Sequence, residues 1–120
     1  MNPKINILIL NWNGSKYLID LIRSINKNAY SNYKITVIDN NSDDDSLDKI
    51  NKEKVDIISH KYNYKYAKGY NKAIFELKND DSEFLLLLNN DTICDKNILN
   101  SFLHALNQYG DNCIMGAKIL

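Results

Sequence analysis

The segment Phe84–Thr92 constrains the fold most, because five consecutive apolar residues run directly into Asn-Asn-Asp-Thr. A short apolar run without apolar/polar alternation is typical of a strand that is covered on both faces of a sheet. The polar residues would then lie at the carboxyl end of that strand, where ligands bind in open α/β sheets. Asn and Asp are also common turn residues. From this segment alone, a ligand site and an ordinary turn are equally good interpretations.

Short apolar runs alternate with amphipathic segments along the rest of the chain. We predict strands at residues 5–10, 33–38, 55–59, 84–88 and 113–120. We predict helices after Ser15, at residues 46–51, around Gly69 and after Asp95, with Ser15 and Asp95 as helix caps. This alternation predicts a mostly parallel sheet with helices on both faces. A chain of 120 residues is long enough for a single domain over residues 1–120.

Composition and charge narrow the classes of function. The formal net charge is +0, so the chain has no overall field that attracts nucleic acid, and we expect no nucleic-acid partner. We find no signal peptide and no apolar run long enough to span a membrane. We therefore expect a cytoplasmic domain. Docking of this domain at the inner face of the membrane stays open. Cys94 and Cys113 are expected to be free thiols.

Three of the predicted strands end in polar clusters. The carboxyl ends of parallel strands meet at one edge of a sheet, so we expect these clusters to converge on a shared cleft. The chain is rich in Asn and Asp, and chance could also produce this pattern. The clusters are Asn11–Asn13, Asp39–Ser42 and Asn89–Thr92.

The side chains in and near these clusters suit a nucleoside diphosphate with a metal ion. Asp39 can accept hydrogen bonds from a base or a sugar. Asp91 can bind a divalent cation, and its oxygen-rich surroundings favour Mg²⁺ or Mn²⁺ over zinc. Lys65 and Lys68 can face phosphate oxygens, and a helix that opens at Gly69 would attract anions through its N–H groups.

The sequence lacks the motifs of several other nucleotide and metal sites, which excludes those sites. The chain has neither a G-x-G-x-x-G after its first strand nor a P-loop. A receiver domain needs acidic residues after the first strand, where this chain has Asn11. The scattered Cys and His residues give no zinc signature. We interpret Asp43–Asp45 as a solvated loop, in preference to a second metal site.

Four segments then make the sequence familiar, and their order and spacing carry the resemblance. They are I-L-I-L-N-W-N-G (7–14), V-I-D-N-N-S (37–42), A-K-G-Y-N-K-A-I (67–74) and L-L-L-N-N-D-T (86–92). Together they resemble the N-terminal, donor-binding half of family 2 inverting glycosyltransferases, and most closely the rhamnosyltransferase-like branch. The resemblance implies a Rossmann-like GT-A domain, a three-layer α/β/α structure truncated before the acceptor-binding half. Gly116–Leu120 is similar to the strand that precedes that half.

The resemblance also implies which residues hold the nucleoside. Asn11, Trp12 and Asn13 would line the pocket for the base and the ribose. Asp39 would bind the base at its imide N–H. These roles follow from the match to the family's motifs.

The remaining implied contacts are with the diphosphate and the metal. Lys65 would face the diphosphate, and Gly69 and Asn71 would lie near the phosphates. Asn90 and Asp91 would correspond to the family's D-x-D-like motif, with Asp91 as the ligand of Mg²⁺ or Mn²⁺. Asn90 stands where the fuller motif has an acid, which makes the metal site less negative.

The implied activity is the transfer of a sugar from a UDP-, dTDP- or GDP-linked donor, with inversion, to a hydroxyl group of a glycan or lipid-linked acceptor in cell-surface polysaccharide synthesis. The general base is expected beyond Leu120, so we identify no catalytic residue in this chain. Two alternatives stay open: a nucleotide-binding module or subunit without catalysis, and a purely structural α/β domain. Without an acceptor half, exposed apolar surface would favour homo-oligomers.

Overall fold

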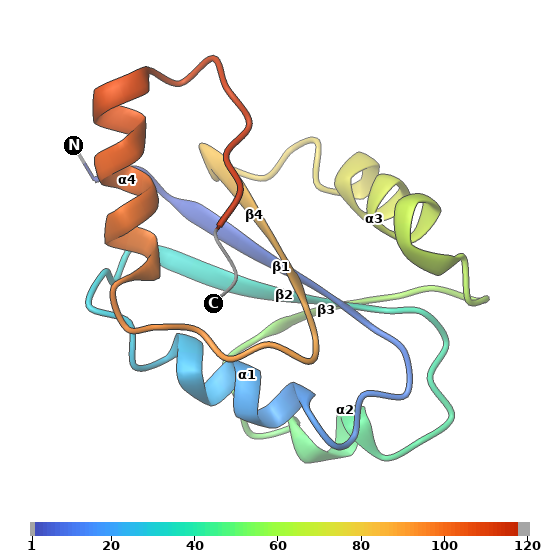
Figure 1. Cartoon of the computed structure of the whole chain (residues 1–120). Helices are drawn as coiled ribbons and strands as arrows, with labels where there is room; N and C mark the ends of the chain where they lie inside the picture. Colours follow the sequence, from blue (N-terminus) through green and yellow to red (C-terminus); the bar gives the residue numbers. More distant parts are fainter. Residues whose placement is uncertain (1, 118–120) are drawn as a thin grey trace.

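The computed structural model describes residues 2–117 as one parallel sheet between helices. The strands are β1 (Ile5–Asn11), β2 (Tyr33–Asp39), β3 (Asp56–Ser59) and β4 (Phe84–Asn89). Their order is β3-β2-β1-β4, and every neighbouring pair is parallel (Figure 1). The helices are α1 (Leu18–Ile25), α2 (Ser46–Lys49), α3 (Lys65–Glu76) and α4 (Ile98–Tyr109). Within the described residues, no helix combines the length and the apolar character needed to cross a membrane.

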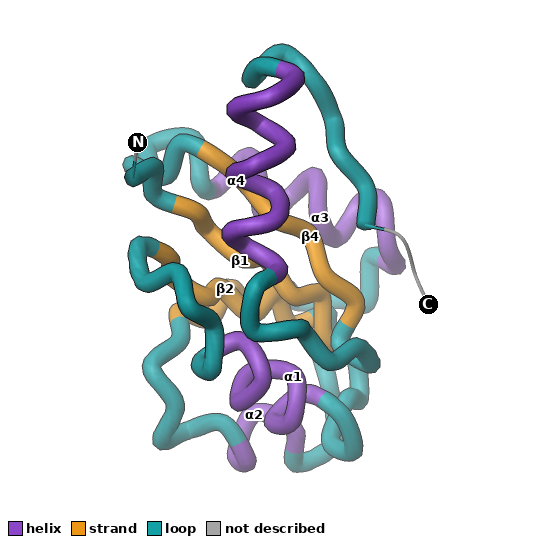
Figure 2. The backbone as a smooth tube through the Cα atoms, turned by 60° about the vertical axis from the view of Figure 1, so that its left-hand side comes forward, coloured by secondary structure: helices purple, strands orange, loops and turns teal. Residues whose placement is uncertain are grey.

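The core has two parts, one on each face of the sheet, which confirms the predicted three-layer arrangement. Figures 1 and 2 show α3 on one face and α1, α2 and α4 on the other. The smaller part consists of Leu8 and Ile38 of the sheet and Tyr70 and Ala73 of α3. The larger part contains the predicted apolar stripe of α1, and its buried members are Ile5, Ile7, Ile9, Leu18, Leu21, Ile22, Ile25, Ile35, Val37, Ile50, Cys94 and Leu99.

The prediction that strand 84–88 is covered on both faces is wrong. Phe84, Leu86 and Leu88 pack against the larger core, whereas Leu85 and Leu87 are 42% and 41% exposed. The reason is the position of β4 at the edge of the sheet, because α3 packs mainly over β1 and β2. An unbroken apolar run does not reveal whether its strand is central or lies at an edge.

The predicted start of the third helix also needs correction. The helix begins at Lys65, so Gly69 lies inside its second turn and cannot provide an anion site at the N-terminus. A Cβ atom on Gly69 would lie 2.9 Å from Asn40 Nδ2 and 3.0 Å from Leu10 Cδ1. The glycine therefore allows α3 to approach the ends of β1 and β2 closely.

Neither predicted helix cap is at the start of its helix. The α1 helix begins only at Leu18, and the hydroxyl of Ser15 donates to Asp45 in the loop before α2. The N-cap of α4 is Asn97, whose N–H donates to Asp95 Oδ1 at 2.8 Å. These side chains bind neighbouring polar groups before the helices begin.

The predicted last strand does not form in the part of the chain that the structure describes. Residues 113–117 are irregular, and residues 118–120 lie outside the described range. Met115, Gly116 and Ala117 face α4 across a cavity. A strand needs a ladder of hydrogen bonds to a neighbour, and this segment makes none with β4 among the described residues.

An ion-pair cluster lies at the opposite end of the sheet from the polar clusters. Lys34 Nζ bonds to Asp80 and lies 3.7 Å from Asp56 Oδ2. Burial by itself would raise the pKa of Asp80, but hydrogen bonds from Lys34 and Ser82 hold this pKa down at about 2. The hydrogen bond to Asp80 likewise raises the pKa of Lys34. The folded state therefore favours the ionised pair.

We predict that Asp80→Asn lowers the free energy of unfolding by about 1–2 kcal/mol at pH 7. The folded-state pKa of Asp80 is depressed, so its stabilising contribution is present above the unfolded-state pKa and is lost as the pH falls toward 2. Denaturant titrations of both proteins from pH 7 downward should therefore converge at low pH. Asp81→Asn is the comparison variant, because Asp81 is 75% exposed and solvent screens its bond to Lys4, so its deficit should be smaller. A deficit that stays constant with pH would contradict this assignment.

Candidate functional site

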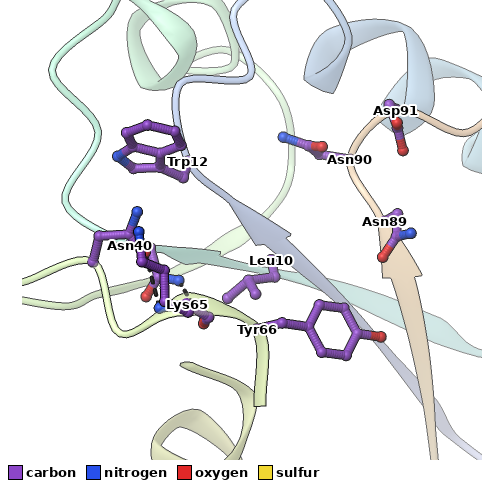
Figure 3. Close-up of a pocket in the computed structure, with 9 residues that line it drawn as sticks. Leu10, Trp12, Asn40, Lys65, Tyr66, Asn89, Asn90 and Asp91 are labelled. Atoms are coloured by element: carbon purple, nitrogen blue, oxygen red, sulfur yellow. Dashed lines mark hydrogen bonds between the residues drawn. The ribbon is translucent and has the colours of Figure 1, made fainter. Parts of the chain in front are cut away.

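A pocket of about 430 Å³ lies where the carboxyl ends of the strands meet. Strand register sets its position, because Asn11 lies opposite Asp39 and Leu10 lies opposite Asn89. The polar ends of three strands therefore share one edge, as the sequence predicts. The residues that line the pocket are Leu10, Trp12, Asn40, Asn63, Lys65, Tyr66, Asn89, Asn90 and Asp91 (Figure 3).

Four of the nine predicted site residues line this pocket, and they form two walls. Trp12 and Lys65 lie on one side, and Asn90 and Asp91 lie on the other (Figure 3). The Trp12 ring is 54% exposed, and Lys65 Nζ lies 5.9 Å from its centroid. An exposed indole offers a flat surface for a base, and the adjacent ammonium group offers a charge for an anion.

Two asparagine side chains fix the backbone of Lys65. The sequence analysis placed Asn40 in the cluster Asp39–Ser42 without a role of its own, and it did not select Asn63. Lys65 has a φ of +63°, which is uncommon for a residue other than glycine. Asn63 Oδ1 accepts its N–H at 2.9 Å, and Asn40 Nδ2 donates to its carbonyl at 3.0 Å. These bonds hold Lys65 at the pocket despite the unfavourable conformation. An Asn two residues before Lys65 was an available turn signal, whereas the role of Asn40 depends on tertiary contacts.

Asn11 and Asp39 lie behind the pocket and do not line it. They are 0% and 4% exposed, and Asn11 Nδ2 donates to Asp39 Oδ1 at 3.1 Å. The same Nδ2 lies 3.0 Å from Ser46 Oγ and 3.2 Å from Ser42 Oγ. Ser42 donates to both oxygens of Asp39, through its hydroxyl at 2.7 Å and its N–H at 3.0 Å. Asp39 thus anchors a buried network, and its contact with a base stays a prediction.

Asn90 connects this buried network to the pocket wall. Its Nδ2 donates to Asn11 Oδ1 at 3.1 Å. Gly14 lies against this contact, because a Cβ atom there would fall 2.2 Å from Asn11 Oδ1 and 2.4 Å from Asn90 Nδ2. In the sequence, Gly14 is only the last residue of the segment 7–14, and its packing role becomes visible only in three dimensions.

Three other predicted residues lie outside the pocket lining. Asn13 is exposed and binds the loop after β2, since its N–H donates to Ser42 Oγ at 2.9 Å. Gly69 is buried against Asn40, and Asn71 is exposed on α3. Their contacts with a donor nucleotide stay predictions. Lys68 also lies outside the lining, with its Nζ 4.9 Å from the ring of Tyr64.

Tyr70 was missed by the sequence analysis and supports the site from α3. Its hydroxyl donates to the carbonyl of Leu88 at 2.9 Å and accepts the N–H of Leu10 at 3.4 Å. Burial raises the pKa of this phenol, although the hydrogen bond from Leu10 opposes the shift. The tyrosine therefore stays neutral and joins α3 to the carboxyl ends of β1 and β4. No periodic signal distinguished it from the other tyrosines.

The oxygen donors of the pocket fit a hard divalent cation that a ligand helps to hold. Asp91 is the only acidic residue in the lining, and the amides of Asn89 and Asn90 adjoin it. Across residues 2–117, no cluster of three or more His, Cys, Asp or Glu side chains could hold a metal by itself. Mg²⁺ is commonly held by one or two carboxylates together with substrate phosphates. The donor set therefore fits Mg²⁺ or Mn²⁺ together with a diphosphate, and the role of Asp91 as the protein ligand stays a prediction.

Comparison with known proteins gives a family and a fold. The sequence model of glycosyl transferase family 2 matches residues 6–119. A comparison of the sequence with curated proteins found no match. The S. aureus TarS 1-349 structure has a TM-score of 0.77 at 22% identity, covering 88% of this chain and 33% of that one. The mannosyltransferase PcManGT from Pyrobaculum calidifontis has a TM-score of 0.79 at 14% identity, covering 93% and 34%.

A third solved structure agrees with these two. Glucosyl-3-phosphoglycerate synthase from Mycobacterium tuberculosis has a TM-score of 0.69 at 14% identity, covering 91% of this chain and 41% of that one. The chain thus spans about a third of the TarS 1-349 chain and of the PcManGT chain. At these identities the structures show the fold, and the family assignment rests on the sequence model. The chain therefore belongs to glycosyl transferase family 2, and it has the α/β GT-A fold of these glycosyltransferases.

Proposed function

We propose that this chain binds the nucleoside-diphosphate sugar donor of a glycosyltransferase, together with Mg²⁺ or Mn²⁺. One observation carries the proposal: an exposed indole with a lysine faces a carboxylate with two amides across one pocket. Related structures support it, because TarS is described in complex with UDP and with UDP-GlcNAc. PcManGT is described in complex with GDP-Man and Mn²⁺.

The two walls suggest how such a donor would lie. Trp12 would stack against the base or the ribose, and Lys65 would pair with diphosphate oxygens. Asp39 would bind the imide N–H of the base, and its Oδ2 has the capacity for this bond because it accepts one hydrogen bond among the described residues. A carboxylate oxygen can accept two. Asp91 would then hold the cation at the far wall, against the diphosphate.

The proposed reaction is a single displacement at the anomeric carbon with inversion. The cation, when bound at Asp91, would neutralise charge on the departing diphosphate. Lys65 would add a second positive charge on the opposite wall. The acceptor hydroxyl needs a general base. Since Asp91 is the only acidic residue in the pocket lining, we propose that the base comes from outside residues 1–120.

The wider biological role also belongs to this proposal. We propose a UDP-, dTDP- or GDP-linked donor and a glycan or lipid-linked acceptor, in polysaccharide synthesis at the cytoplasmic face of the membrane. The exposed side chains of Leu85 and Leu87 provide an apolar surface for self-association. A nucleotide-binding module without catalysis is the second candidate, and the single carboxylate of the pocket favours it.

We predict that UDP, dTDP or GDP stabilises the chain and that Mn²⁺ increases the effect. A ligand at about 100 times its Kd adds roughly 2.7 kcal/mol to the free energy of unfolding, which thermal melting detects. Asp91→Ala should remove the part that depends on Mn²⁺, whereas Asp111→Ala, at an exposed acid outside the pocket, should not. The absence of a shift with every nucleotide would overturn donor binding. A Mn²⁺ effect that survives Asp91→Ala would overturn the metal assignment.

We also predict that Lys65→Ala weakens UDP binding about tenfold, because a charge-assisted hydrogen bond to phosphate is lost. The affinity for uridine should change much less, since uridine carries no phosphate. Isothermal titration calorimetry with both ligands measures the difference. Lys68→Ala is the matched control, because Lys68 lies three residues away and outside the pocket. Equal losses for the two variants would show that the effect is non-specific charge.

A further inference from the structure

The orientation of the Asn90 side chain is determined by a buried carboxylate that it does not touch. Asp39 is an acceptor when ionised, so the Asn11 atom that faces Asp39 Oδ1 at 3.1 Å must be the donor Nδ2. Asn11 Oδ1 consequently points to the other side. There it accepts a hydrogen bond from Asn90 Nδ2 at 3.1 Å. Each amide in this series fixes the next.

This series determines which atom of Asn90 remains available to a ligand. One N–H of its Nδ2 donates to Asn11, which turns the NH₂ group toward β1. Its Oδ1 accepts no hydrogen bond among the described residues and belongs to the pocket wall that also carries Asp91. An amide oxygen can bind or face a cation, whereas an NH₂ group would repel it. Building on the proposed function, we infer that Asn11 is a positioning residue that turns the oxygen of Asn90 toward the divalent cation.

The surroundings hold Asn11 in this single orientation. It is 0% exposed, and its Nδ2 also lies within hydrogen-bond distance of Ser42 and Ser46. A reversed amide would place Asn11 Oδ1 against the carboxylate of Asp39 and would leave Asn90 Nδ2 without its acceptor. Glycine at position 14 leaves room for the contact between Asn11 and Asn90, and any side chain at this position would collide with both amides. Buried polar networks are costly when they are partly satisfied, which stabilises the observed orientation.

The same geometry accounts for an amide at position 90 where an acid would otherwise suit a cation. A carboxylate there would face Asn11 Oδ1, so two acceptors would meet at the position of the present 3.1 Å hydrogen bond. Residue 11 therefore restricts the choice at residue 90. The cation site receives its one full charge from Asp91, and Asn90 contributes an oriented dipole.

The first test uses the unaltered chain without ligand, so it does not depend on the proposed function. NMR should show contacts between the side-chain NH₂ protons of Asn90 and the α protons of Gly14, with slow exchange of those NH₂ protons. The exposed Asn107 on α4 provides the reference for a free amide. An Asn90 NH₂ group that exchanges as fast as that of Asn107, without contacts to Gly14, would overturn the inference.

The second test is a double-mutant cycle on Mn²⁺ affinity, measured by calorimetry with saturating UDP. Asn90→Ala should weaken Mn²⁺ binding about tenfold or more, and Asn11→Ala should do the same although it lies behind the pocket. The double variant should be no weaker than the weaker single variant, because both remove one oriented oxygen. Asn6→Ala is the matched control, since Asn6 is also buried in β1 and bonds to Thr36.

The outcomes separate the inference from the proposed function. A folded Asn11→Ala variant that keeps the Mn²⁺ affinity of the unaltered chain would overturn the positioning role alone. Additive losses in the double variant would do the same. If the unaltered chain shows no Mn²⁺-dependent binding of UDP, the proposed function fails, and the inferred role toward a cation fails with it. The NMR contacts decide the positioning if Asn11→Ala does not fold.

Discussion

The parallel pairing of β1 with β2 on one side and β4 on the other is the constraint on which the rest of the structure depends. Its register places Asn11 opposite Asp39 and Leu10 opposite Asn89. A shift of one residue would turn every side chain of β1 to the other face of the sheet. Such a shift would break the buried hydrogen bonds that join Asn6 to Thr36 and Asn11 to Asp39, and it would repack β1 in both parts of the core. Buried hydrogen bonds and core packing together thus set the geometry of the polar edge.

The polar edge divides into a buried support and an exposed contact surface. Asp39 and Asn11 are buried and hydrogen-bonded to each other, so their side chains are held in fixed positions. Trp12, Lys65 and Asp91 are exposed at the pocket, where a ligand can reach them. Residues without contact with a ligand can then determine how accurately the others are placed. Asn90 is the point at which the two groups meet.

The arrangement of helices and strands was largely predictable, because its signal is the burial of apolar stripes. The stripe of α1 and the apolar run of β1 pack as their periodicities indicate. The run at β4 misled because apolar content does not reveal an edge position. The predicted helix starts at Ser15 and Gly69 were wrong. Ser15 binds a distant loop through its side chain, and Gly69 allows a close approach of the α3 backbone to the sheet. Such contacts exist only after folding.

The candidate site was predictable as a place and less so in its atoms. Polar clusters after parallel strands indicate the edge, and by resemblance Trp12 was assigned to the nucleoside pocket and Asp91 to the metal. The sequence does not show that Asp39 is enclosed, because that depends on Ser42 and Asn11 folding back over it. The support of Lys65 likewise comes from Asn63, in the loop before α3, and Asn40, in the loop after β2, which only the fold brings together.

Paramagnetic broadening by Mn²⁺ in the presence of UDP tests the central claim most directly, because it locates the metal in the intact fold. The account predicts that backbone NMR signals of Asn89–Thr92 disappear first, followed by those of Trp12 and Lys65 across the pocket. Signals of α4 beyond its first turn should persist. Broadening centred on the exposed acidic loop Asp43–Asp45, or unaffected by UDP, would contradict a shared nucleotide and metal site.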